Sequence, residues 1–255
     1  MGKNMKYDGL ETSYWSLQSN RVATLLDKVN SRESALSNGR IIPEDNDLAL
    51  GVGRRIKMAV LFLDISKFSS RDMETEAEQN NMLNALNLYF TEMIKIAEDY
   101  GGTVEKNTGD GLMAYFEDNG GSPPERGCKR AIACSLTMFA ANKEIISPIL
   151  SRSGIAPFEF RISIDYGYVT IAKLGAARRF NQYVAIGATA NFAAKMLAKA
   201  PPNKIVIGEG VKLELPLDWQ LQFTSISPET SGWVLKNTSA SYNLYEYTGR
   251  WNKLI

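Results

Sequence analysis

The sequence predicts an α/β fold of the α+β type, in which helices flank a central, mostly antiparallel sheet and a helical arm precedes it. Strand and helix patterns follow one another in the order strand, helix, strand, strand, helix, strand, which is the split βαβ or ferredoxin-like arrangement. The chain has 255 residues, of which 44% are hydrophobic and 22% charged, enough for one substantial core. We expect residues 1–50 to form the arm and its linker, and residues 51–255 to form one folded domain.

The N-terminal arm is expected from residues 8–32, where apolar side chains recur at nearly helical spacing with charged residues between them. A polar, proline-containing stretch ends this pattern before Asp47. An apolar helical stripe usually packs against other protein surface. We therefore expect the arm to pack against the body of the protein or against a second subunit, rather than to bind a ligand.

The first strand of the domain is expected in the apolar run MAVLFLDI, which is typical of a buried strand and carries Asp64 at its end. An amphipathic helix follows, with its apolar positions over residues 82–97. Residues 103–106 and 112–116 then predict two short strands joined by a tight turn. This turn places Asp110 at the tip of a hairpin.

The second half of the domain repeats the helix and strand patterns. A capping-box spacing at residues 122–125 predicts a helix from there to about residue 145. Alternating polar and apolar residues predict a strand over 158–164 that turns at Gly167, and a third helix is expected over 189–200. Further strand patterns cover residues 168–174, 204–207, 219–223, 233–236 and 242–247.

The complete absence of histidine excludes several enzyme classes. Histidine is the side chain whose unperturbed pKa suits proton transfer near neutrality. Its absence excludes serine-histidine-aspartate hydrolases, zinc enzymes with histidine ligands and histidine-aspartate phosphodiesterases. The net charge of +1 leaves no basic field that could hold a nucleic acid, so no nucleic-acid partner is expected.

We expect a cytoplasmic protein with no direct membrane insertion. No apolar run approaches the roughly 18 to 20 residues that cross a bilayer, and the polar start lacks a signal-peptide core. The two cysteines, Cys128 and Cys134, fall on different turns and faces of one predicted helix, too far apart for a disulfide. They are therefore expected to be reduced, buried thiols.

Two aspartates are the first candidates for chemistry. In the predicted topology the first strand pairs beside the hairpin, so the carboxylates of Asp64 and Asp110 can converge. Two carboxylates without histidine indicate a magnesium or manganese site. For either aspartate alone, a helix-cap or turn role is the more common one.

Four ordered motifs resemble those of the class III nucleotidyl cyclases. They are FLDISKFS at 62–69, EKNTGDGLMAYF at 105–116, RRFNQYVAIGATAN at 178–191, and LKN at 235–237 followed by YEY at 245–247. The resemblance covers about residues 57–248 and implies a nucleotidyl cyclase catalytic domain over residues 51–255. It implies cyclisation of a nucleoside triphosphate, in which the ribose 3′-hydroxyl attacks the α-phosphorus and pyrophosphate leaves.

The same resemblance implies two divalent metal ions, Mn²⁺ or Mg²⁺, bound by Asp64, Asp110 and the carbonyl of Ile65. A metal pair roughly 4 Å apart lowers the pKa of the attacking hydroxyl and stabilises the leaving pyrophosphate. The resemblance also places Asn191 at the ribose, and Lys195 where the family has an arginine that stabilises the pentavalent phosphorus. Lysine lacks the bidentate fork of arginine, so an ordinary solvated helix lysine is the alternative for Lys195.

The remaining implied contacts concern the triphosphate and the base. Arg179 and Lys236 are candidate triphosphate contacts, with an ordinary exposed charge as the alternative for Arg179. In the family the positions of Lys106 and Val184 face the base. Lys106 can only donate hydrogen bonds, and Val184 accepts none. A buried base amino group left unpaired costs roughly 1–3 kcal/mol, which disfavours adenine, guanine and cytosine, whereas O4 of uracil can accept from Lys106.

We therefore expect UTP as the substrate and 3′,5′-cyclic UMP as the product. This chain resembles the bacterial pyrimidine (uridylate) cyclases of Pycsar anti-phage defence. A cytidylate cyclase, an adenylate cyclase and a catalytically inactive nucleotide-binding homologue are the alternatives. Sites in the family form between two subunits and all the groups are present in this chain, so a homodimer with shared active sites is expected. A downstream cyclic-nucleotide effector is implied by the resemblance alone.

Overall fold

The computed structural model describes residues 9–30, 53–107, 109–118, 126–174, 182–226, 233–234 and 239–251. The helices are α1 (Thr12–Asn30), α2 (Glu76–Asp99), α3 (Gly127–Ala141), α4 (Ser147–Arg152), α5 (Ala188–Leu197), α6 (Glu209–Glu214) and α7 (Leu217–Gln220). The strands are β1 (Gly53–Ile65), β2 (Thr103–Asn107), β3 (Gly111–Glu117), β4 (Phe160–Leu174), β5 (Gln182–Ile186), β6 (Ile205–Gly208), β7 (Phe223–Ile226) and β8 (Leu244–Tyr247). A 3₁₀ turn, η1 (Phe68–Ser70), and a π-helical segment, η2 (Asn142–Ile146), are also present. Within these residues no helix is both long and apolar enough to cross a membrane.

The central sheet has the strand order β2-β3-β1-β4-β6-β8-β7, and β5 pairs with β4. Strand β1 is antiparallel to both of its neighbours, β3 and β4, whereas β4 and β6 are parallel. The first four strands thus follow the order β2-β3-β1-β4 of a ferredoxin-like sheet. The predicted α/β fold, with a mostly antiparallel sheet and flanking helices, is confirmed.

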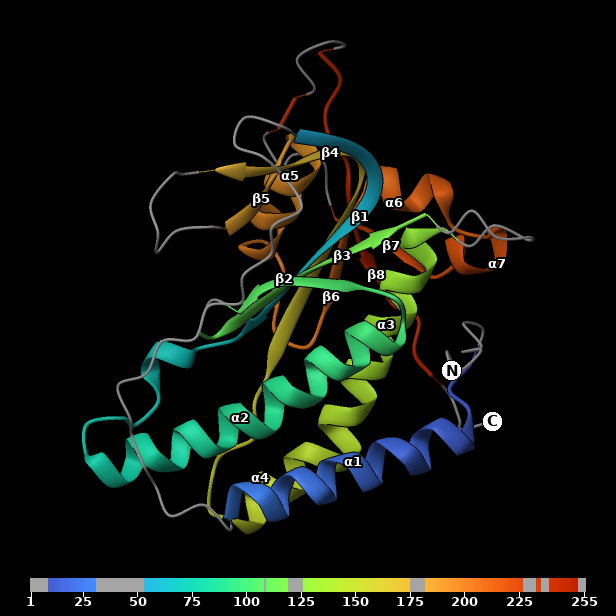
Figure 1. Ribbon diagram of the computed structural model, residues 1–255. Coiled ribbons are helices and arrows are strands. Elements are labelled where there is room, and N and C mark those ends of the chain that lie inside the picture. Colours follow the sequence, from blue (N-terminus) through green and yellow to red (C-terminus); the bar gives the residue numbers. More distant parts are fainter. Residues whose placement is uncertain are drawn as a thin grey trace.

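The two faces of the sheet are covered by different helices (Figure 1). Because side chains alternate along a strand, β1 directs Leu61 and Leu63 into the core beneath α2 and α3. It directs Met58 and Val60 into a second cluster that includes residues of α5. Helix α5 packs on β4 and β1. The side of the sheet under α5 therefore carries the smaller of two hydrophobic cores.

Strand β4 differs from the prediction, because it runs without interruption from Phe160 to Leu174, whereas the sequence predicts a turn at Gly167. The backbone at Gly167 stays in the strand and pairs with Met58. A Cβ atom at this position would collide with the hydroxyl of Thr189 on α5. The glycine therefore serves the close approach of α5 to the sheet rather than a change of chain direction.

The second long helix also differs from the prediction. Helix α3 starts at Gly127 with Arg126 as its N-cap residue, and the expected cap at residues 122–125 lies outside the described residues. The Gly127 amide donates to Oδ1 of Asp118 at 2.9 Å. The helix does not stop near residue 145 but continues through η2 into α4. Cys128 and Cys134 are buried free thiols in α3, as predicted.

The segment over residues 219–223 is the end of a short helix, a turn and the first residue of a strand, although its alternating apolar residues predict a strand throughout. The Trp219 amide donates to the Pro216 carbonyl at 3.0 Å, which begins the short helix α7. The strand β7 starts only at Phe223. Alternation over so few residues does not separate a strand from a helical turn.

The N-terminal helix α1 packs against α2, as the apolar stripe predicts. Arg21 pairs with Oε1 of Glu92 at 2.8 Å and with Oδ2 of Asp99 at 3.1 Å, and the hydroxyl of Tyr14 donates to Asp99 at 3.0 Å. Glu92 is only 2% exposed, and burial raises the pKa of its carboxyl. The charge of Arg21 therefore compensates an acid that α2 buries.

Candidate functional site

The two predicted metal-binding aspartates come from neighbouring strands. Asp64, near the end of β1, is in register with Gly111 of β3 and with Arg161 of β4. The Ile65 amide donates to the Asp110 carbonyl at 2.8 Å. This hydrogen bond continues the β1–β3 ladder past its last strand pair. The backbones that carry Asp64, Ile65 and Asp110 are thereby brought together, as the predicted hairpin arrangement requires.

An arginine that the sequence motifs do not single out pairs directly with Asp64. Nε and Nη2 of Arg161 lie 2.9 and 2.8 Å from Oδ2 of Asp64. The two side chains are 30% and 19% exposed, so the ion pair is only partly screened by water. The pairing of Arg161 with Asp64 could be predicted from the sequence only if the register of β4 against β1 were known. Its charge makes it a further candidate for binding phosphate.

The oxygen ligands at the strand ends fit divalent cations. Carboxylate and carbonyl oxygens are hard ligands, and Mg²⁺ is commonly held by one or two carboxylates together with substrate phosphates and water. Among the described residues no group of three acidic, histidine or cysteine side chains gathers as a metal site. Asp64, Asp110 and the Ile65 carbonyl could therefore hold a cation that shares its coordination with a substrate.

The loop after β1 is tied to the segment that leads into β4. The Ser66 amide donates to the Glu159 carbonyl at 2.8 Å. Lys67 has φ 56° and ψ 31°, the left-handed conformation that non-glycine residues adopt infrequently. The loop then enters η1. The backbone beside Asp64 therefore follows a fixed, tight path.

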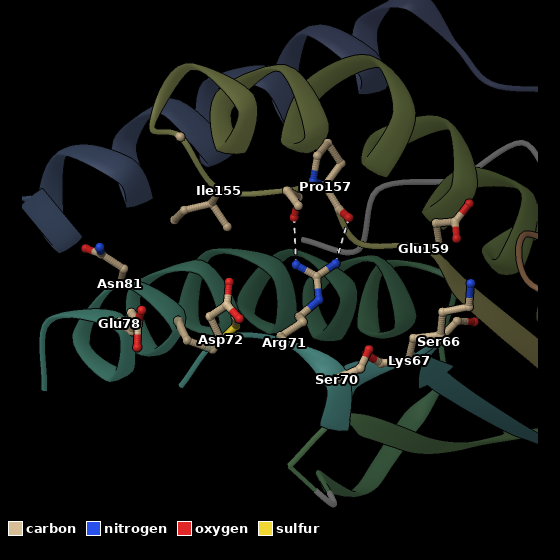
Figure 2. A pocket seen from close by; sticks show the side chains of 13 residues that line it. Ser66, Lys67, Ser70, Arg71, Asp72, Glu78, Asn81, Ile155, Pro157 and Glu159 are labelled. Carbon is tan, nitrogen blue, oxygen red and sulfur yellow. Dashed lines mark hydrogen bonds between the residues drawn. The ribbon is translucent and has the colours of Figure 1, made fainter. Parts of the chain in front are cut away.

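A cavity of about 520 Å³ opens beside this loop. Figure 2 shows the Arg71 guanidinium at its wall, where it donates to the carbonyls of Ala156 and Pro157, both at 2.7 Å. The charged residues around the cavity are Lys67, Arg71, Asp72, Glu78 and Glu159. Acids outnumber bases, and the arginine already binds carbonyl oxygens. The cavity is therefore poorly suited to a triphosphate, although it adjoins the loop that follows Asp64.

The predicted ribose and phosphorus contacts lie on α5. Asn191 and Lys195 share a face of this helix and are both exposed. Within the described residues neither side chain makes a hydrogen bond or an ion pair. The opposite face of α5 is buried, and Oγ of Ser163 in β4 donates to the Ala193 carbonyl at 2.7 Å. Asn191 and Lys195 are thus presented outward from a helix that is anchored to the sheet.

The four predicted contacts to the base and triphosphate are not described at the side-chain level. Arg179 and Lys236 lie outside the described residues. The backbones of Lys106 and Val184 belong to β2 and β5, but their side chains also lie outside the described part. These assignments remain predictions.

Several known proteins similar to this chain are named as nucleotidyl cyclases. The chain is 28% identical over 193 residues to a uridylate cyclase from Burkholderia cepacia. This alignment covers 69% of this chain and 80% of the relative. It is 27% identical over 190 residues to an adenylate cyclase from Anabaena cylindrica, covering 73% of this chain but only 36% of the relative. The solved adenylyl cyclase CyaB from P. aeruginosa superposes with a TM-score of 0.60 at 27% identity, over 80% of this chain and 100% of that one.

These relatives are named for different bases, so similarity alone does not select one. The family described as the adenylate and guanylate cyclase catalytic domain matches residues 52–231, well over half of the chain. The matched region contains β1, the β2–β3 hairpin and α5, which carry the aspartates and the exposed asparagine and lysine described above. The chain therefore belongs to the adenylate and guanylate cyclase catalytic domain family.

Proposed function

We propose that this protein cyclises UTP to 3′,5′-cyclic UMP and pyrophosphate with the help of two divalent metal ions, Mn²⁺ or Mg²⁺. The observation that carries the proposal is the pairing of the β1 and β3 ends, which brings Asp64, Ile65 and Asp110 together in a family of nucleotidyl cyclases. Bound cations would lower the pKa of the ribose 3′-hydroxyl and neutralise charge on the pyrophosphate that leaves. Positioning and charge neutralisation provide most of the catalysis in such phosphoryl transfers.

The residues around Asp64 have two proposed roles, which are to bind the cations and to bind the phosphates of the substrate. Asp64, Asp110 and the Ile65 carbonyl would bind the cations. Arg161 now pairs with Asp64. With a cation bound to Asp64, the guanidinium of Arg161 would be free to donate hydrogen bonds to phosphate oxygens, for which its planar fork is well suited. Arg161 thereby joins Arg179 and Lys236 as a proposed triphosphate contact.

The exposed face of α5 supports a homodimer with shared active sites. Asn191 would orient the ribose and Lys195 would place positive charge at the reacting phosphorus, each against the aspartates of the partner subunit. A mixing experiment tests this arrangement. Asp64→Ala and Asn191→Ala would each be inactive alone, whereas an equal mixture of exchanging subunits recovers about a quarter of the parent activity, because half the dimers carry one intact site. No recovery in a mixture shown to form heterodimers would contradict sites shared between subunits.

The proposed preference for uracil depends on Lys106 and Val184, because neither side chain can accept a hydrogen bond from a base amino group. Product analysis by mass spectrometry, with an equal mixture of the four triphosphates and Mn²⁺, tests it. Cyclic UMP should be the main product. Faster turnover of ATP than of UTP would instead assign an adenylate cyclase, and a dominant cyclic CMP product would assign a cytidylate cyclase. Equal turnover by parent and Asp64→Ala would remove the metal mechanism.

We further propose that the cyclic nucleotide acts as a second messenger in bacterial anti-phage defence, through an effector that binds it. The support is the resemblance to uridylate cyclases and the similarity to the Burkholderia cepacia relative. A phage-challenge assay of cells expressing the parent or Asp110→Ala, together with the neighbouring genes of its source, tests this role. Protection that depends on Asp110 supports it, and equal survival with the two proteins contradicts it.

A further inference from the structure

A buried acid and a buried tyrosine meet behind α5. Asp165 of β4 is 2% exposed, and Tyr242, which precedes β8, is 6% exposed. The Tyr242 hydroxyl donates a hydrogen bond to Oδ1 of Asp165. A side chain at Gly208 of β6 would collide with both groups, so the glycine leaves the space that they fill. The pair is therefore enclosed by β4, β6 and the segment before β8.

The ring of Tyr242 connects this pair to α5. It stacks on the ring of Phe192 with centroids 4.4 Å apart and an angle of 20° between the planes. Trp233 also stacks on Phe192, at 5.7 Å and 19°. The Tyr242 amide donates to the Trp233 carbonyl at 2.8 Å, so the two rings belong to paired segments. Phe192 directly follows Asn191. These stacked rings therefore lie next to the exposed face of α5 that carries Asn191.

A second contact holds the helix axis in place. Oγ of Ser163 donates to the carbonyl of Ala193, the residue after Phe192. Ser163 and Asp165 lie on the same face of β4, because they are two residues apart in a strand. The Ser163 bond fixes the backbone of α5 against the sheet. The Tyr242 ring, bonded to Asp165, contacts α5 at Phe192, one residue before the anchored carbonyl.

We propose that the Asp165–Tyr242 pair is a positioning element that sets the orientation of α5, and with it the placement of Asn191 and Lys195. This inference rests on the proposed function, in which those two side chains contact the nucleotide. Neither Asp165 nor Tyr242 is assigned a contact with substrate. Their role is to hold Phe192 and so reduce the number of orientations that the face bearing Asn191 can adopt.

The pair also makes this orientation sensitive to pH. Burial raises the pKa of Asp165 to about 7, opposed by the hydrogen bond from Tyr242 and by the Tyr166 amide. The other groups facing the pair are the Gly210 amide and the carboxylate of Glu209 on α6, both of which act on Tyr242. A carboxylate accepts a stronger hydrogen bond than a neutral carboxylic acid. The hydrogen bond from Tyr242 to Asp165 should therefore weaken as the pH falls through about 7.

Fluorine NMR tests the link without depending on activity. The chain has 4 tryptophans, which can be replaced by 5-fluorotryptophan, and Trp233→Phe identifies the resonance that reports the stack on Phe192. In the parent this resonance should move with pH, with a midpoint near 7. In Asp165→Asn the movement should disappear. A resonance that does not titrate in the parent, or that titrates equally in Asp165→Asn, would overturn the inference.

Kinetics test the consequence for the active site. Tyr242→Phe keeps the ring and removes the hydroxyl, so we expect kcat to fall about tenfold with a change in KM below about twofold, because misplaced groups cost rate at unchanged triphosphate binding. Tyr100→Phe is the matched control, since it removes a buried hydroxyl bonded to Thr137 in the other core. It should lower thermal stability and leave kcat unchanged. Equal loss of kcat in both variants, or a changed melting temperature alone in Tyr242→Phe, would contradict positioning.

The two tests separate this inference from the proposed function. A parent protein that makes no cyclic nucleotide from any triphosphate defeats the proposed function, while the fluorine titration still decides whether Asp165 controls the stack on α5. An active parent with an unresponsive Trp233 resonance defeats the positioning role alone.

Discussion

The ionisation of Asp165 should make the stability of this protein fall as the pH rises, and Asp165→Asn should remove that fall. Burial raises the pKa of the carboxyl from an ordinary value of 3.8 to about 7. The folded state therefore keeps a proton that the unfolded chain has already released between these two pH values. Stability is then fully present below pH 3.8, decreases up to about pH 7 and stays level above it.

The size of the effect follows from the same two values. At about 1.36 kcal/mol per pH unit, the full interval corresponds to about 4 kcal/mol, and the part between pH 5 and pH 8 to about 3 kcal/mol. Urea unfolding of the parent and of Asp165→Asn at both pH values measures it. The free energy of unfolding of the parent should drop by about 3 kcal/mol more than that of the variant. Identical pH dependence in the two proteins would show that Asp165 is already ionised at pH 5, and the reasoning from burial would fail.

Three further outcomes follow from the site and the arm. Asp110→Ala should lower kcat by at least about 1,000-fold through loss of a cation ligand, with a far-ultraviolet spectrum like that of the parent; retained turnover would exclude Asp110 as a ligand. Arg161→Gln should tighten Mn²⁺ binding, measured by calorimetry without nucleotide, and lower kcat about 10- to 100-fold, because it frees Asp64 and removes a phosphate contact; unchanged Mn²⁺ affinity would contradict the competition. Arg21→Met should lower the free energy of unfolding in urea by about 3 kcal/mol, because it leaves Glu92 unpaired. Adding Glu92→Leu should restore most of that loss. Equal stability of the single and double variants would contradict a buried charge.

The architecture was predictable from the sequence because its strongest local patterns agree with one topology. The run MAVLFLDI is apolar on both faces, which places its strand in the middle of the sheet, where β1 lies between β3 and β4. The helical spacing over residues 82–97 falls within α2. Once the first strand is central and the hairpin is adjacent, Asp64 and Asp110 must end near one another. The positions of the aspartates in the fold could therefore be inferred before any distance was known.

What the sequence could not predict depends on contacts between distant segments. A glycine in a strand pattern indicates either a turn or a close approach, and only the Thr189 hydroxyl behind Gly167 decides between them. Arg161 lies far from Asp64 along the chain, and its pairing requires the register of β4. No local pattern joins Asp165 to Tyr242, which become neighbours through the β4–β6–β8 order.

The polar row on β4 joins the two parts of the proposed active site. Arg161, Ser163 and Asp165 are alternate residues of one strand and so lie on the same face. The first pairs with Asp64, the second holds the backbone of α5, and the third holds the ring against which Phe192 packs. In the proposed homodimer, Asp64 and α5 of one subunit belong to different active sites. Strand β4, together with β1 on which α5 also packs, would therefore connect the proposed cation-binding end of one site with the proposed ribose-binding helix of the other.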